Sequence, residues 1–386
     1  MKKLVLLPLV ALMLGLVSIG GAQAAETIKI GAIFNTTGGA SSIDRPGLLG
    51  AELAADEINT RGGYHGKNLV LINIDGESDP TKAKEAAEKL IYRYKVAAII
   101  GLNDPAYALP AGQAAQQAGI PFVTAGATLP TLPDRVGNCM FLAPFGDDAQ
   151  AQALAHFAHE TLKAKTAWIL TDSASDYTRA LTGYFKDKFG ALAGKTAISA
   201  EDQYKTGDTE FSAQIGRLKA LNPKPDVLMV SALPSECGLI VKQLRAAGVK
   251  TPIIGGDGFD TPLLLEVGGK ATHDVYFSTH ISFDNPRPTV RNFVKAFKKA
   301  YGRAPKVAFA ALGYDALRLV YAAIDQAGRA EPQAIREALA KMKDFHGVTG
   351  TISYQPGQRV PTKPVTIIKV ANQKFRFAQE VGPAKP

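Results

Sequence analysis

Cysteine is scarce in this chain of 386 residues, which contains only Cys139 and Cys237. Neither cysteine has the sequence context of a catalytic nucleophile. An oxidising compartment would permit one disulfide between them. Closing a loop of about 100 residues in this way is worth up to ~4–5 kcal/mol in the chain-entropy model. Two buried free thiols are the equally weighted alternative, because the sequence cannot test whether the geometry permits a bond.

Complete enzyme motifs are also missing. There is no G-x-S-x-G elbow, and the run Gly190–Thr196 has three residues between its glycines where a phosphate-binding loop has four. That run follows an expected helix, so it is interpreted as a helix end and a turn. Gly256-Asp257-Gly258 lacks the third glycine of a dinucleotide fingerprint. His156 and His159 lie one turn apart but have no evident third metal ligand. The sequence therefore predicts no enzyme, no cofactor and no metal site.

Dense basic blocks are absent although the formal net charge is +9. The positive residues are spread along the chain without interleaved aromatics, which excludes a nucleic-acid role. The only long apolar run is Leu4–Ile19, preceded by Lys2-Lys3 and followed by Ala22-Gln23-Ala24. A membrane anchor would need ~20 apolar residues. The pattern instead predicts a secretory signal peptide over residues 1–24, cleaved near Ala24, and an exported chain without a lipid-bearing cysteine.

After the export signal, apolar strand runs alternate with amphipathic helices. Ile28–Ile33 predicts a strand, Asn35–Arg45 a loop with Gly38-Gly39, and Leu69–Asp75 a second strand after a helix that stops at Gly62-Gly63. The alternation continues to about Gly255 and predicts α/β architecture with parallel sheets covered on both faces. Beyond Asp284 helices dominate, with short strands near the end of the chain. The remaining length suits two domains.

Polar and glycine residues gather in loops at the expected carboxyl ends of strands, where ligands of open α/β sheets bind. Each loop alone is compatible with ordinary turn chemistry. The loops in question are Gly101–Tyr107, Ala125–Thr128, Asp172–Tyr177 and Gly256–Asp260.

Taken together, these loops and the runs Gly50–Ala54 and Asp56–Asn59 resemble the leucine/isoleucine/valine-type periplasmic binding proteins, the type I solute receptors of ABC importers. The resemblance implies two Rossmann-like lobes joined by a three-strand hinge, with the ligand in the cleft. It implies an N-terminal lobe of residues 27–143 and 282–347 and a C-terminal lobe of residues 144–281 and 348–386. It also implies a periplasmic monomer that binds an amino acid or a related small molecule and serves a membrane permease.

Carried over residue by residue, the resemblance implies a ligand clamp at Thr128 with the backbone of Gly126 and Ala127. It implies an aromatic contact from Tyr177 and an acid for an α-ammonium at Asp257. The remaining candidate ligand-binding residues are Asp104, Tyr107 and Arg45.

Several positions depart from the family pattern. Pro105 stands where a hydroxyl residue commonly binds the ligand's carboxylate, Asp104 beside it would repel that carboxylate, and aromatics are absent at Ile43 and Leu233. Arg45 could supply the missing positive charge. The alternatives are therefore a receptor for aromatic or aliphatic carboxylates, a partner of a ligand-sensing receptor, and an exported α/β enzyme.

Overall fold

The computed structural model describes residues 26–382, so the expected signal peptide lies outside the described residues. The first of its two lobes is built on a five-stranded parallel sheet with strand order β2-β1-β3-β4-β5. The continuous apolar character of these strands suits a parallel sheet that is covered on both faces. Its strands are β1 (Ile28–Phe34), β2 (Leu69–Asp75), β3 (Ala98–Gly101), β4 (Phe122–Thr124) and β5 (Met140–Leu142).

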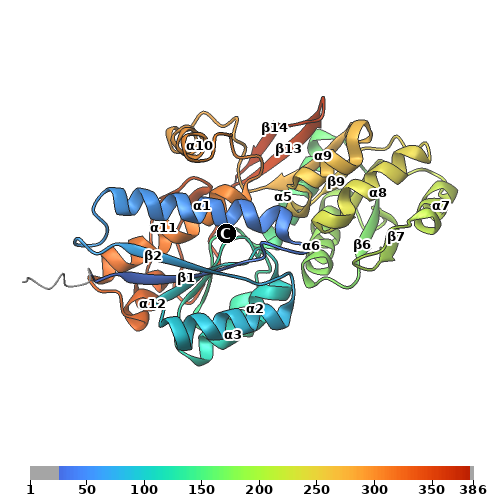
Figure 1. Ribbon diagram of the computed structural model, residues 1–386. Coiled ribbons are helices and arrows are strands. Elements are labelled where there is room, and N and C mark those ends of the chain that lie inside the picture. Colours follow the sequence, from blue (N-terminus) through green and yellow to red (C-terminus); the bar gives the residue numbers. More distant parts are fainter. Residues whose placement is uncertain (1–25, 383–386) are drawn as a thin grey trace, which may run out of the picture.

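Helices from both ends of the chain cover this sheet, as Figure 1 shows on its left side. α1 packs lengthwise on α11, and residues of both belong to one hydrophobic core. Asp79 and Asp104 cap α2 and α3, and each is followed by a proline at the first helical position, where a missing N–H costs nothing. The helices are α1 (Ser41–Thr60), α2 (Pro80–Glu88) with a π-helical turn (Lys89–Tyr94), α3 (Pro105–Gln117), α4 (Leu132–Val136), α10 (Pro288–Tyr301), α11 (Phe309–Ala327) and α12 (Pro332–Ala340).

The second lobe contains a seven-stranded sheet with strand order β14-β13-β10-β9-β8-β6-β7. Five of these strands run parallel, and β13 and β14 form an antiparallel edge. The strands are β6 (Ala167–Asp172), β7 (Ile198–Tyr204), β8 (Val227–Ser231), β9 (Ile253–Gly255), β10 (Val275–Thr279), β13 (Val365–Ala371) and β14 (Lys374–Val381).

Helices cover both faces of the second sheet as well. Two of them, α5 and α6, pack against each other beside the junction of the lobes. The helix α6 ends at Ala193, so the run Gly190–Thr196 is a helix end and a turn, as predicted. The helices are α5 (Asp147–His156) with a π-helical turn (Phe157–Thr161), α6 (Asp176–Ala193), α7 (Ser212–Ala220), α8 (Pro234–Ala246), a 3₁₀ turn (Asp257–Phe259), α9 (Pro262–Gly268) and a further 3₁₀ turn (Gly269–Thr272).

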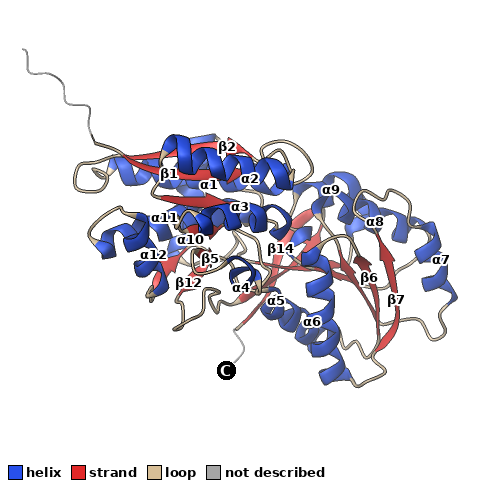
Figure 2. Ribbon diagram, turned by 90° about the horizontal axis from the view of Figure 1, so that it is seen from below, coloured by secondary structure: helices blue, strands red, loops and turns tan. Residues whose placement is uncertain are grey.

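The chain passes between the lobes three times. The second sheet takes strands that precede α10 in the sequence and strands that follow α12, whereas α10, α11 and α12 themselves belong to the first lobe. The first passage follows β5, the second follows β10, and the third precedes β13. Figure 2 shows the lobes side by side from below. Before the third passage lies a small antiparallel pair, β11 (Phe345–Gly347) and β12 (Gly350–Ile352), and Ile352 and Tyr354 still pack into the first core.

Two local predictions are wrong. The loop predicted over residues 35–45 ends sooner, because α1 begins at Ser41 and carries Pro46 inside its second turn. The pattern also missed the strands β5, β10 and β11. Within residues 26–382, no helix combines the length and the apolar character that a membrane crossing needs.

Candidate functional site

The candidate site lies between the lobes, where loops from both sheets meet. From the first lobe comes the loop after β4. Thr128 is buried there, and its carbonyl accepts a hydrogen bond from the backbone N–H of Asp147 at 2.8 Å. The backbone N–H of Ala127 donates to the Thr124 hydroxyl at 3.1 Å. This loop is therefore fixed to the beginning of α5, at the first passage between the lobes.

Gly126 has no room for a side chain. A Cβ atom at this position would lie 2.4 Å from the Asn103 side-chain oxygen and 2.9 Å from the Phe309 ring. Asn103 is itself buried and donates through Nδ2 to Asp44 Oδ1 at 2.6 Å. The glycine thus allows the loop backbone and the Asn103 amide to lie against each other.

The second lobe contributes the loop after β9. Asp257 is 3% exposed, and its carboxylate accepts hydrogen bonds from His280 Nε2 at 3.0 Å and from Gln150 Nε2 at 3.2 Å. The Gln150 side-chain oxygen in turn accepts from the Asp257 backbone N–H at 3.2 Å. His280 lies at the second passage between the lobes and stacks on Phe145 at the first.

Tyr177, in the first turn of α6, completes this side. Its hydroxyl accepts a hydrogen bond from the Gly258 backbone N–H at 3.1 Å. Burial, followed by the nearby charges of Asp257 and Asp147, raises the pKa of the Tyr177 hydroxyl well above its usual value, so the phenol stays neutral. Burial also lowers the pKa of His280, so this imidazole is neutral at pH 7 and donates a hydrogen bond without adding positive charge.

Three buried carboxylates face this cluster. Besides Asp257, these are Asp104 from the first lobe and Asp147 from the first turn of α5. Burial raises the pKa of Asp104 to about 6, although its hydrogen bond from Ala106 N–H opposes the rise and the charge of Asp257 adds to it. Burial and then Asp257 raise the pKa of Asp147 well above the usual range. Ionising Asp104 and Asp147 beside Asp257 is therefore unfavourable, and a cation placed among them would stabilise their charged forms.

The structure brings most of the eight sequence candidates together but not all of them. Thr128, Tyr177, Asp257 and Asp104 come together, with the backbone of Gly126 and Ala127 beside them. Tyr107 is half-buried in the first turn of α3, next to Asp104, and burial, followed by the charge of Asp104, raises the pKa of its hydroxyl. Arg45 is exposed and donates to the Thr36 carbonyl, so its contacts do not join it to the cluster.

Sequence reasoning missed Asn103, Asp147, Gln150 and His280. Gln150 and His280 reach Asp257 across 107 and 23 residues of sequence, and no local pattern records such a contact. The sequence signal that could have found two of them is their position, because Asp147 and His280 stand at the first and second passages between the lobes. Within the described residues, no group of three or more His, Cys, Asp or Glu side chains is arranged to hold a metal ion.

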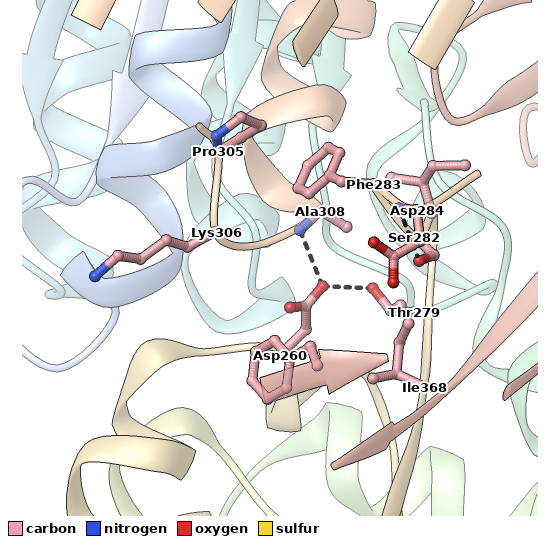
Figure 3. A pocket seen from close by; sticks show the side chains of 11 residues that line it. Asp260, Thr279, Ser282, Phe283, Asp284, Pro305, Lys306, Ala308 and Ile368 are labelled. Atoms are coloured by element: carbon pink, nitrogen blue, oxygen red, sulfur yellow. Dashed lines mark hydrogen bonds between the residues drawn. The ribbon is translucent and has the colours of Figure 1, made fainter. Parts of the chain in front are cut away.

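A cavity of about 160 Å³ lies behind this cluster, at the second passage between the lobes. Figure 3 shows the Asp260 carboxylate at its wall, between Thr279 and Ala308, the residue directly before α11. Asp260 Oδ2 accepts from the Thr279 hydroxyl at 2.6 Å and from the Ala308 backbone N–H at 3.0 Å. Asp260 thereby links the second lobe to a helix of the first, and burial raises its pKa to about 7.

Comparison with known proteins agrees with this architecture. A family model described as periplasmic binding protein matches residues 27–374. The Leu/Ile/Val-binding protein BraC3 of Rhizobium johnstonii is 30% identical over 329 residues, which cover 85% of this chain and 87% of that protein.

Two solved structures are similar over nearly the whole chain. The branched-chain amino acid transporter substrate binding protein LivJ of Streptococcus pneumoniae, in complex with isoleucine, has a TM-score of 0.86 at 30% identity and covers 93% of this chain and 100% of its own. The leucine binding protein LivK of Thermotoga maritima has a TM-score of 0.86 at 32% identity, with 92% and 99% covered. The chain therefore belongs to the periplasmic binding protein family, with two lobes of the type I fold.

Proposed function

We propose that this protein is the periplasmic substrate-binding component of an ABC importer of the branched-chain-amino-acid type, which captures an amino acid or a related small polar molecule between its lobes and delivers it to a membrane permease. The observation that carries the proposal is the buried polar cluster in which Thr128 of the first lobe is linked through Asp147 and Gln150 to Asp257 of the second, with Tyr177 beside it. BraC3, LivJ and LivK, which resemble the chain along most of its length, bear names of amino-acid-binding proteins. The proposal includes export to the periplasm with loss of residues 1–24, and a monomeric state.

Ligand binding would act through closure. The residues of the cluster come from both lobes, so a ligand touching Thr128 and Asp257 together prefers the closed form and shifts the equilibrium towards it. Besides the bond from the Ala308 N–H to Asp260, the lobes touch elsewhere through polar side chains. Thr261 donates to the Ser42 hydroxyl at 3.1 Å, and Arg135 pairs with Asp176 at 2.7 Å. Arg135 and Asp176 are both substantially exposed, so this pair contributes little by itself.

The proposal is tested by identifying the ligand. Protein purified under native conditions is denatured, and the released small molecule is identified by mass spectrometry. The identified compound is then added to ligand-free protein, where a concentration of 100 times the dissociation constant should raise the free energy of unfolding by ~2.7 kcal/mol. The ligand must be recovered unchanged. A compound that is chemically converted, with no small molecule raising the melting temperature, would contradict the proposal and favour an exported enzyme.

A further inference from the structure

Two helix N-termini at the cluster, those of α3 and α6, are already occupied by acceptor groups of the chain itself. At α3, Asp104 Oδ1 accepts from the Ala106 N–H at 2.7 Å, and Pro105 offers no N–H at all. At α6, Ser175 caps the Thr178 N–H at 3.4 Å. At α5 no side chain caps the N-terminus, but the buried carboxyl group of Asp147 stands in the first turn. Free N–H groups at helix N-termini are the usual binding places for a ligand's carboxylate. Here the positive ends of the helices are neutralised from within.

The nearby charges are mostly negative, although Arg135 and Arg179 pair with Asp176 and Lys363 is buried near His280. The charged groups that most affect the pKa of Asp104 are the carboxylates of Asp257, Asp176 and Asp172. The charged groups that most affect the pKa of Asp147 are Asp257 and Asp148. Lys363 is a buried cation whose charge affects the pKa of His280. Its ammonium group donates to the Ala143 carbonyl at 3.1 Å and to the Thr349 hydroxyl. A carboxylate brought into this region would be repelled, whereas a cation would be stabilised.

Within the described residues, two fully desolvated acceptor atoms at the cluster have no donor in hydrogen-bonding geometry, although the Thr128 side chain lies near enough to Asp147 to oppose the rise in its pKa. These are Asp147 Oδ2 and the Asn103 side-chain oxygen, which lies against Gly126. Both residues are more than nine-tenths buried. Their other polar atoms are used, because Asp147 Oδ1 accepts from Gln150 at 2.7 Å and Asn103 Nδ2 donates to Asp44. A buried acceptor without a donor is destabilising, so the N–H groups of a ligand are the expected partners of these two atoms.

We propose that the ligand is a small organic cation, either a primary amine or an amino-acid derivative whose carboxyl group is amidated or absent, and that Asp147 and Asn103 receive its N–H groups together with Asp257. The cation is organic, because the described residues provide no cluster of ligands suited to a metal. This inference rests on the proposed function and narrows its ligand class.

The test compares matched compounds. Ligand-free protein is titrated by calorimetry with sets that share one side chain: leucine, leucinamide, 3-methylbutylamine and 4-methylpentanoate, and the corresponding phenylalanine and alanine sets. We expect an amine or an amide to bind about tenfold or more tightly than its parent amino acid and its parent carboxylate. If an amino acid or a carboxylate binds most tightly, the inference is wrong and the proposed function stands. If no member binds and no compound is released from native protein, both are wrong.

Variants separate an electrostatic role from a structural one. Asp104→Asn keeps a good helix cap, and Asp147→Asn keeps the size of the side chain, while each removes one negative charge. Each variant should weaken amine binding by about tenfold or more and leave carboxylate binding unchanged or stronger. Asp187→Asn, on the exposed side of α6, is the matched control and should change neither. If the first two variants weaken both kinds of ligand equally, their role is structural and the inference fails.

Discussion

Replacing Asp257 by asparagine should abolish tight binding while leaving the fold intact. Asparagine keeps the size of the side chain, and its oxygen can still accept the Gln150 Nε2–H bond. The new amide N–H group would face His280 Nε2. His280 Nδ1 has no hydrogen-bond partner, so the imidazole can move its proton to Nδ1 and accept at Nε2 instead. We therefore expect the ligand-free variant to lose no more than about 2 kcal/mol of unfolding free energy.

We expect the loss of ligand-binding free energy to be larger than this loss of stability. Removing one member of a buried charge pair typically costs ~3–5 kcal/mol, which corresponds to a loss of affinity of roughly 100-fold to several thousand-fold. Calorimetry with the identified ligand measures this loss, and thermal unfolding without ligand measures the stability. Asp260→Asn is the matched control, because Asp260 lies on the same loop and is equally buried, but its carboxylate binds Thr279 and Ala308.

The control should lower the melting temperature and reduce affinity by less than about tenfold. If Asp257→Asn binds as tightly as the unmodified protein, the ligand carries no cationic group at that position. The reasoning from the buried acid would then be refuted.

Further predictions concern the first lobe and the cysteines. Thr128→Val should weaken ligand binding by ~1–3 kcal/mol in calorimetry, because it leaves one neutral partner unpaired, whereas Thr161→Val on the surface should have no effect. Cys139 and Cys237 are both buried and free, so a thiol reagent should find two thiols in denaturant and react slowly with the native protein; zero or one would contradict the structure. Burial raises the pKa of Asp44 to about 7, so this carboxyl binds its proton more tightly in the folded state than in the unfolded one. The contribution of Asp44 to the free energy of unfolding is therefore full below about pH 4 and falls by up to ~4 kcal/mol as the pH rises towards 7. Urea unfolding measured between pH 4 and 7 should show a smaller fall for the Asp44→Asn variant.

The alternation of strands and helices could be predicted from the sequence because each long element carries its own pattern. Asp79-Pro80, for example, marks the start of α2, where the Asp79 side chain caps the helix. The start of α1 was misplaced because Pro46 resembles a first helical residue. In the structure one further turn precedes it, where the carboxylate of Asp44 accepts the Asn35 N–H at 2.7 Å. That contact depends on the position of β1 and has no local signature.

The candidate site was predictable only in part for a similar reason. Loops after parallel strands point to the ligand edge of a sheet, and this rule together with the family resemblance selected Thr128, Tyr177 and Asp257. It could not select Gln150 or His280, because they lie on a helix and on a passage between the lobes. Their function arises from contacts made after both lobes have folded. Residues of this kind are found only when the second sheet is placed beside the first.

The same contacts explain why closure and ligand charge should be coupled. Asp104 belongs to the first lobe and Asp257 to the second, and each is buried when the lobes meet. Bringing two like charges out of water and towards each other opposes closure, whereas the hydrogen bonds from Ala106, Gln150 and His280 only partly offset this cost. A cation between the lobes reverses the sign of the interaction. A ligand of the wrong charge would therefore fail to close the lobes even if its shape fitted, and this penalty makes the buried acids a basis for selectivity.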